Sequence, residues 1–110
     1  MDLVLVVCGA GASSTFLASR MRTLATERGL DLTARAASTQ DLVSRLPDAS
    51  VLLVGPHLES SFAELAAEAA DHGVAAALLP STAFGAQGAS DALDQALALL
   101  TTTIEGPSHA

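Results

Sequence analysis

The sequence predicts an α/β fold, a single-domain doubly wound four-stranded parallel sheet with helices on both faces. Short apolar runs of strand length alternate along the chain with longer segments in which apolar residues recur every three or four positions. This strand–helix order repeats four times with short connections, which favours parallel strands joined by right-handed crossovers. The chain of 110 residues, half of them apolar, is long enough for one core covered by two layers of helices.

The first strand and helix are the clearest elements. Residues 3–7 form a continuous apolar run, typical of a strand that is buried on both faces. Ser13 and Ser14 are candidate helix caps, and Gly29 favours a helix end. The apolar residues of this helix are Phe16, Leu17, Met21, Leu24 and Ala25. Residues 30–36 then alternate between apolar and polar, which predicts a half-covered strand near a sheet edge.

The middle of the chain predicts two more helices around a buried strand. A short helix is expected to open at Ser38 and to end before Pro47. Residues 51–54 are again wholly apolar and indicate a second strand buried on both faces, closed by residues 55–57. The amphipathic pattern from Leu58 to Gly73 predicts a helix whose apolar stripe belongs to the core.

The last part of the chain predicts one strand and one helix. Residues 74–79 are predicted to form the fourth strand, which Pro80 ends. After a loop rich in small residues, Ser90 is the expected cap of a final helix that reaches residue 104. We therefore expect one domain over residues 1–104 and a disordered tail over residues 105–110.

Composition excludes several classes of function. The formal net charge is −7 and only five residues are basic, so no basic patch is expected to bind nucleic acid. No apolar run approaches the ~18 residues of a membrane span, and no basic leader precedes the first strand. A single cysteine cannot form an internal disulfide. These features predict a cytoplasmic protein without membrane insertion.

Doubly wound sheets bind ligands at the carboxyl ends of their strands, where the strand order reverses. Three segments are expected to meet at that edge: residues 8–15, 55–58 and 80–86. The first of these carries the strongest chemical signal, because it combines the only cysteine, two glycines and three consecutive hydroxyl residues.

Cys8 is expected at the end of the first strand, ahead of a loop of small residues and a helix start. Small residues let backbone N–H groups converge on an anion, and the helix N-terminus adds donors and a positive dipole end. A thiol held there is stabilised as the nucleophilic thiolate. We therefore predict that Cys8 is a catalytic nucleophile that carries a phosphoryl group. The predicted phosphate-binding residues are Gly9, Ala10, Gly11, Ala12, Ser13, Ser14 and Thr15.

Other interpretations of this loop are less favoured. One of them is that Cys8 has no catalytic role and is a small buried apolar residue at the end of the strand. The loop is not a dinucleotide fingerprint, because Ser14 occupies the position of the third glycine, and it lacks the lysine of a Walker loop. No metal ligand set and no cofactor are predicted.

Low-molecular-weight tyrosine phosphatases and related arsenate reductases share the predicted topology and also place a cysteine at the head of a loop. The phosphatase loop ends in an arginine six positions after its cysteine, where this chain has Ser14. Arg20 and Arg22 lie about two helical turns further on. Arsenate reductases need resolving cysteines, and the loop after the fourth strand lacks an acidic residue that could protonate a leaving group. A phosphatase-like hydrolase therefore stays an alternative, as does a non-catalytic regulatory module.

The segment from Cys8 to Thr15 resembles the phosphorylation loop of IIB components of the bacterial sugar phosphotransferase system (PTS), in its lactose/cellobiose branch. That loop has a cysteine, two spacers, a glycine, one spacer and three hydroxyl residues. The run from Val51 to Pro56, the Phe84–Gly85 pair and the terminal helix agree in order and spacing. The resemblance extends from Leu3 to about Thr103.

The resemblance implies a phosphoryl relay. A phosphohistidine on a IIA partner gives its phosphoryl group to Cys8, which passes it to a sugar held by the membrane-embedded IIC transporter. Three positions depart from the family: His57 stands where Gln is usual, Pro80 where Asp is common and Phe84 where Tyr is common. His57 is either an accessory group beside the phosphocysteine or a solvent-facing turn residue.

Overall fold

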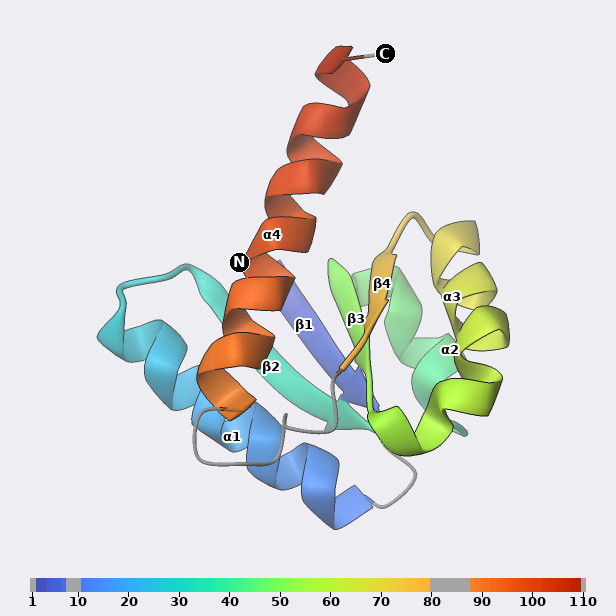
Figure 1. Ribbon diagram of the computed structural model, residues 1–110, viewed down its shortest axis with the longest axis horizontal. Coiled ribbons are helices and arrows are strands. Elements are labelled where there is room, and N and C mark those ends of the chain that lie inside the picture. The colour runs from blue at the N-terminus through green and yellow to red at the C-terminus, as the bar shows by residue number, and fades with distance from the viewer. Residues whose placement is uncertain (1, 8–10, 80–87, 110) are drawn as a thin grey trace.

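The computed structural model (Figure 1) describes residues 2–7, 11–79 and 88–109, with the backbone alone described for 11–14, 43 and 101–109. Four parallel strands form one sheet in the order β2-β1-β3-β4. The strands are β1 (Asp2–Val7), β2 (Leu32–Ala37), β3 (Val51–Val54) and β4 (Ala75–Leu78). The expected four-stranded parallel sheet is confirmed, with β2 at an edge as its alternating pattern indicates.

Two layers of helices cover the sheet (Figure 1). The helices are α1 (Gly11–Glu27), α2 (Leu42–Arg45), α3 (Phe62–Asp71) and α4 (Gly88–His109). α1 and α4 pack on one face, and α2 and α3 pack on the other. None of the helices in the described part of the chain is both long and apolar enough to cross a membrane.

The core lies on both faces of the central strands because successive side chains of a strand point to opposite faces. In β1, Val4 and Val6 pack under α1 and α4, whereas Leu5 and Val7 pack under α2 and α3. All four side chains are fully buried, as are those of β3. Continuous apolar sequence in these two strands therefore reflects burial on both faces, as expected.

Two glycines end helices by the same backbone motif. Gly29 follows α1 with φ +69° and Gly73 follows α3 with φ +72°, a left-handed conformation that favours glycine. The N–H of Leu30 donates to the carbonyl of Ala25 at 2.9 Å, and that of Gly29 to the carbonyl of Thr26 at 3.1 Å. These two bonds define a Schellman ending, so the predicted stop at Gly29 is confirmed, and Gly73 ends α3 with the equivalent pair.

Several predicted helix starts are wrong. α1 begins at Gly11, so Ser13 and Ser14 lie inside its first turn and do not precede it as caps. α4 begins at Gly88, two residues before Ser90. Both helices start on glycine, which makes few conformational demands, so a hydroxyl residue does not by itself mark the boundary.

The other two helices start later than expected. The Oγ of Ser38 accepts the N–H of Asp41 at 3.1 Å, which forms a turn, and α2 begins only at Leu42. It ends at Arg45, before Pro47 as predicted, and a 3₁₀ turn (Leu46–Asp48) continues the chain. A second 3₁₀ turn (Pro56–Ser61) precedes α3, because Pro56 pre-sets the first turn of a helix and Leu58 then departs from helical dihedral angles.

The backbone of α4 is helical through His109. The division into a domain over residues 1–104 and a tail over residues 105–110 stays a prediction. In Figure 1 the C-terminal part of α4 projects beyond the sheet.

Candidate functional site

The strand order creates a switch point between β1 and β3. From β1 the chain crosses to β2 on one side, and the later strands β3 and β4 lie on the other side. The segments that follow β1 and β3 therefore leave the sheet next to each other, with their helices on opposite faces. This is the edge at which the predicted loops were expected to meet.

The carboxyl ends of β1, β3 and β4 lie opposite one another in the sheet. Val7 lies opposite Val54, and Val54 lies opposite Leu78. One residue past each strand the ladder continues: the N–H of Gly55 donates to the carbonyl of Val7, and the N–H of Leu79 donates to the carbonyl of Val54, both at 2.7 Å. The chain after β3 is thereby fixed beside Val7, the residue that precedes Cys8 in the sequence.

The described residues include part of the predicted phosphate cradle. Cys8, Gly9 and Ala10 lie outside them. The backbone of residues 11–14 forms the first turn of α1, and the Thr15 side chain that follows is exposed. The first N–H groups of an α-helix have no partner within the helix, and the positive end of the helix dipole lies there. Only two residues separate this donor set from Cys8 in the chain.

His57 is placed at the same edge of the sheet. It is the second residue of the 3₁₀ turn that follows Gly55, and its side chain is exposed. Gly55 itself is buried, and its carbonyl accepts the N–H of Leu58 at 3.0 Å. The structure thus brings the turn carrying His57 to the switch point. The third predicted segment, residues 80–86 with Pro80 and Phe84, lies outside the described residues.

The arginines of α1 have identifiable contacts away from the helix start. The Nη1 of Arg22 donates to the carbonyl of Ala34 at 2.7 Å, which directs this guanidinium toward β2. The guanidinium of Arg20 lies over the ring of Phe16, 5.7 Å from its centroid. Both residues come more than two turns after Gly11, so neither takes the position that the phosphatase arginine has in its loop.

Two features of this region depart from or add to the sequence analysis. Phe16 was expected in the apolar stripe of α1, but it is 59% exposed, whereas its neighbour Leu17 is buried. Neighbouring residues lie about 100° apart around a helix, so helical spacing groups Phe16 with Arg20 and Thr23 on the polar side and Leu17 with Met21 on the apolar side. In the described part of the chain no three His, Cys, Asp or Glu side chains are grouped as a metal site would require.

Comparisons with known proteins agree on one family. The family described as PTS system, Lactose/Cellobiose specific IIB subunit, matches residues 3–95. No curated protein matches the chain.

Two solved structures share the fold. The lactose-specific IIB component domain of the phosphoenolpyruvate:carbohydrate phosphotransferase system from Streptococcus pneumoniae aligns with a TM-score of 0.64 and 16% identity, over 94% of this chain and 95% of that chain. The cellobiose-specific phosphotransferase IIB component protein from Borrelia burgdorferi aligns with a TM-score of 0.68 and 19% identity, over 93% and 94%.

Proposed function

Because the chain belongs to the lactose/cellobiose-specific IIB family of the phosphotransferase system, we propose that Cys8 accepts a phosphoryl group and passes it to a sugar. The observation that carries this proposal is the place of Cys8 in the sequence relative to the fold. Cys8 directly follows the last residue of β1, a strand that borders the switch point, and two residues separate it from Gly11, where α1 begins. An anion beside a helix N-terminus in a parallel α/β sheet is stabilised by backbone donors and by the helix dipole.

The proposed reaction has two phosphoryl transfers. The thiolate of Cys8 attacks the phosphorus of a phosphohistidine, so that an S–P bond forms, the N–P bond breaks and the imidazole leaves neutral or takes up a proton. A sugar hydroxyl then attacks the same phosphorus and releases its proton to water, the S–P bond breaks, and the thiolate is regenerated. Residues 9–15 hold the phosphoryl oxygens in both steps, chiefly through backbone N–H groups.

The partners follow from the family. The donor is a IIA protein with a phosphohistidine, and the acceptor is a sugar presented by the IIC membrane transporter. In this proposal the relay operates in the cytoplasm, where a lone thiol stays reduced. His57, at the switch-point edge, is proposed as an accessory group that faces the phosphocysteine, and His57→Gln, the usual family residue, is expected to retain transfer.

Covalent labelling tests the proposal. Incubation with phosphoenolpyruvate, the two general relay proteins and a lactose- or cellobiose-type IIA protein should add the mass of one phosphoryl group to the chain. Cys8→Ser should abolish this addition, because a hydroxyl of much higher pKa supplies almost no anionic nucleophile at neutral pH. Intact-protein mass spectrometry measures both. Phosphorylation that persists in Cys8→Ser would contradict the assignment.

Hydrolase activity provides the control. Ser14 stands where a phosphatase loop has its arginine, and neither Arg20 nor Arg22 lies in the first turn of α1. The chain is therefore expected not to turn over aryl phosphates. If the chain hydrolyses p-nitrophenyl phosphate and Cys8→Ser loses this activity, the proposed carrier function is wrong and the protein is a phosphatase.

A further inference from the structure

The sheet register places two residues beside the end of β1, one from each neighbouring strand. Val7 pairs with Ala37 of β2 on one side and with Val54 of β3 on the other. The residues that follow these partners are Ser38 and Gly55. Gly55 has no side chain, whereas Ser38 carries an exposed hydroxyl. Of the two flanking positions, the one on the β2 side is therefore the one that can offer a side chain to the residue after Val7.

The segment after β2 is a fourth segment at this edge, beyond the three that the sequence predicts. Paired strands lie about 4.8 Å apart and consecutive Cα atoms about 3.8 Å apart. Because Ser38 follows Ala37 and Cys8 follows Val7, the Cα atoms of Ser38 and Cys8 are at most about 12 Å apart. Ala36 packs on the α1 side of the sheet and Ala37 on the opposite side, so the alternation of β2 assigns the next position to the α1 side.

The turn that carries Ser38 is held at both ends. Ala37 before it and Leu42 after it are buried in the same cluster as Val7. The N–H of Asp41 donates to the carbonyl of Ser38 at 3.2 Å and to its Oγ at 3.1 Å. The Oγ is an acceptor in this bond, so the bond does not use the hydroxyl hydrogen of Ser38. Ser38 therefore combines a fixed oxygen atom with a hydrogen that can be donated.

Neutral donors have to do most of the anion binding at this edge. The segments that follow the four strands contain no Lys or Arg: residues 8–15, 38–41, 55–58 and 80–86. Apart from the imidazole of His57, a phosphoryl dianion there depends on backbone N–H groups, hydroxyls and the positive end of α1. Hydrogen bonds to an ionised acceptor are stronger than those between neutral groups, so one additional hydroxyl has a measurable effect.

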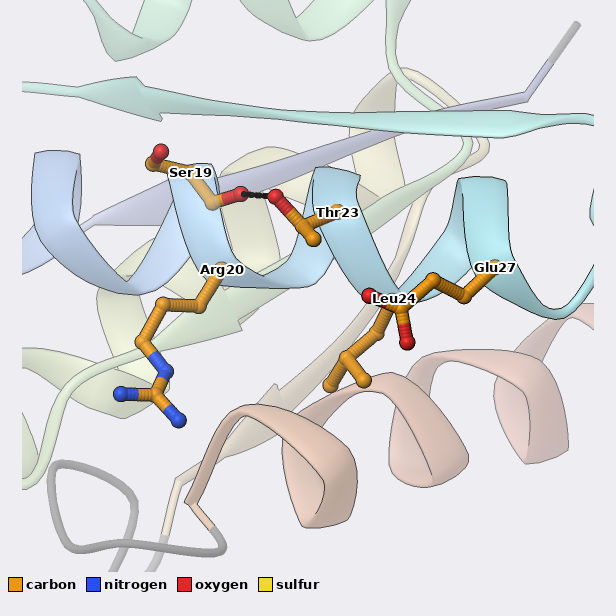
Figure 2. A pocket seen from close by; sticks show the side chains of 5 residues that line it. All are labelled: Ser19, Arg20, Thr23, Leu24 and Glu27. Atoms are coloured by element: carbon orange, nitrogen blue, oxygen red, sulfur yellow. Dashed lines mark hydrogen bonds between the residues drawn. The ribbon is translucent and has the colours of Figure 1, made fainter.

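The nearest arginines along α1 are engaged away from this edge. The guanidinium of Arg20 lies over the ring of Phe16, and Arg20 also lines a hollow of about 260 Å³ (Figure 2). The described residues that line this hollow all belong to α1, and they include Glu27 as well as Arg20, so its charges favour neither an anion nor a cation. Arg22 donates to the carbonyl of Ala34 in β2. Neither arginine supplies the donor that Ser38 offers.

We propose that the hydroxyl of Ser38 donates a hydrogen bond to the phosphoryl group on Cys8, as a phosphate-binding residue outside the loop of residues 9–15. This inference rests on the proposed phosphoryl transfer to Cys8. A phosphoryl dianion accepts this bond more strongly than an uncharged thiol does. Ser38 therefore stabilises the phosphorylated chain relative to the free chain, and it takes no part in the making or breaking of the S–P bond.

The equilibrium of phosphoryl exchange between a phosphorylated IIA protein and Cys8 tests the proposal, and intact-protein mass spectrometry of the mixture measures it. Ser38→Ala should lower the equilibrium constant about tenfold or more, the effect of losing one hydrogen bond to a charged group. Ser50→Ala is the matched control and should leave the constant unchanged. The Ser50 hydroxyl precedes β3 at the opposite edge of the sheet, where it donates to the carboxylate of Asp2.

Two isosteric variants separate the donor role from the role of Ser38 in its turn. Asparagine and aspartate both supply an oxygen that can accept the N–H of Asp41, but only asparagine can also donate. Ser38→Asn should restore most of the loss seen in Ser38→Ala. Ser38→Asp should lie below Ser38→Ala, because its carboxylate repels the dianion. If Ser38→Ala does not fold, this pair alone gives the comparison.

The titration of the phosphoryl group is a second measurement, which a purely structural role of Ser38 would not change. A donor to the dianion lowers the second pKa of the phosphoryl group, so Ser38→Ala should raise this pKa, as followed by ³¹P NMR against pH.

The outcomes separate this inference from the proposed function. A wild-type equilibrium constant and phosphoryl pKa in Ser38→Ala would overturn the donor role and leave Cys8 as the carrier. Equal losses in Ser38→Asn and Ser38→Asp would overturn it as well, because asparagine retains donors. If the wild-type chain accepts no phosphoryl group, or if Cys8→Ser still accepts one, the proposed function fails and this inference fails with it.

Discussion

At the scale of single residues, the strongest local effect is the field that acts on Cys8. The residue follows a strand buried on both faces and precedes a helix of 17 residues, whose N-terminal donors and dipole favour an anion. Burial of a thiol would act in the opposite direction by disfavouring the charged thiolate, and Val7, the preceding residue, is fully buried. We expect the helix terminus to prevail, because it acts within one turn of the chain.

The acidity of Cys8 is a direct prediction. The pKa of its thiol should lie below the value of about 8.5 for a free cysteine, since loop amides and the positive end of α1 stabilise the thiolate. The rate of alkylation by iodoacetamide, measured against pH, reports this pKa. The same chain unfolded in urea is the control, because its thiol loses the helix terminus. If the midpoint of the curve of alkylation rate against pH lies above that of the unfolded chain, burial of the thiol dominates, and Cys8 is then a structural cysteine.

At the scale of elements, the helix endings at Gly29 and Gly73 matter most. Gly29 has φ +69°, and a Cβ added there would meet no atom within 4 Å. Gly29→Ala should therefore lower the free energy of unfolding by about 1–2 kcal/mol through backbone strain alone. Urea denaturation followed by circular dichroism measures the change.

A matched variant isolates the backbone effect at this position. Gly29→Asn should lower the free energy of unfolding by less than Gly29→Ala does, because asparagine tolerates left-handed dihedral angles better than alanine does. Equal losses in the two variants would show that the added side chain, and not the dihedral angle, is responsible.

The contact between α1 and α4 is a second element-scale feature. Just past α1, the guanidinium of Arg28 donates to the carboxylate of Asp94 at 2.7 Å and to the Oγ of Ser90 at 2.8 Å. The side chains of this ion pair are 34% and 63% exposed, so water screens it and its contribution to stability is at most about 1 kcal/mol. Apolar packing of Leu93 and Ala96 under the sheet holds α4 more strongly.

At the scale of the whole molecule, β3 joins the two halves of the core. Leu52 packs under α2 and α3, and Leu53 packs under α1 and α4; both are fully buried. Leu52→Ala and Leu53→Ala should each lower the free energy of unfolding by about 2–5 kcal/mol, because each leaves a cavity in its own layer. Phe16→Ala, at an exposed side chain, should change it by less than about 0.5 kcal/mol.

Urea unfolding monitored by circular dichroism gives these values together with the dependence on denaturant. If the two layers unfold as one cooperative unit, the slope of the free energy of unfolding against urea concentration should be unchanged in both leucine variants. A reduced slope in only one variant would show that its layer unfolds separately, and the single-domain description would then fail.

The sequence by itself determined the strands, their parallel arrangement and the family of the chain. The continuous apolar runs of β1 and β3 predicted burial on both faces, and both strands lie in the centre of the sheet, whereas the equally apolar β4 lies at an edge and is half-buried. Gly29 and Gly73 marked helix ends because a positive φ is a local property of the chain. The motif from Cys8 to Thr15 likewise needs only neighbouring residues, and it identified the family that matches residues 3–95.

Tertiary structure alone decided where the helices begin and which distant segments lie together. The exposure of Phe16, by contrast, follows from its helical spacing with Arg20 and Thr23, since Leu17, which shares its spacing with Met21, is buried. The hydroxyls of Ser13, Ser14 and Ser90 are candidate caps in sequence, but the backbone of α1 is helical from Gly11 and that of α4 from Gly88. The hydrogen bond from Gly55 to Val7 joins residues far apart in the chain, and no local pattern specifies it.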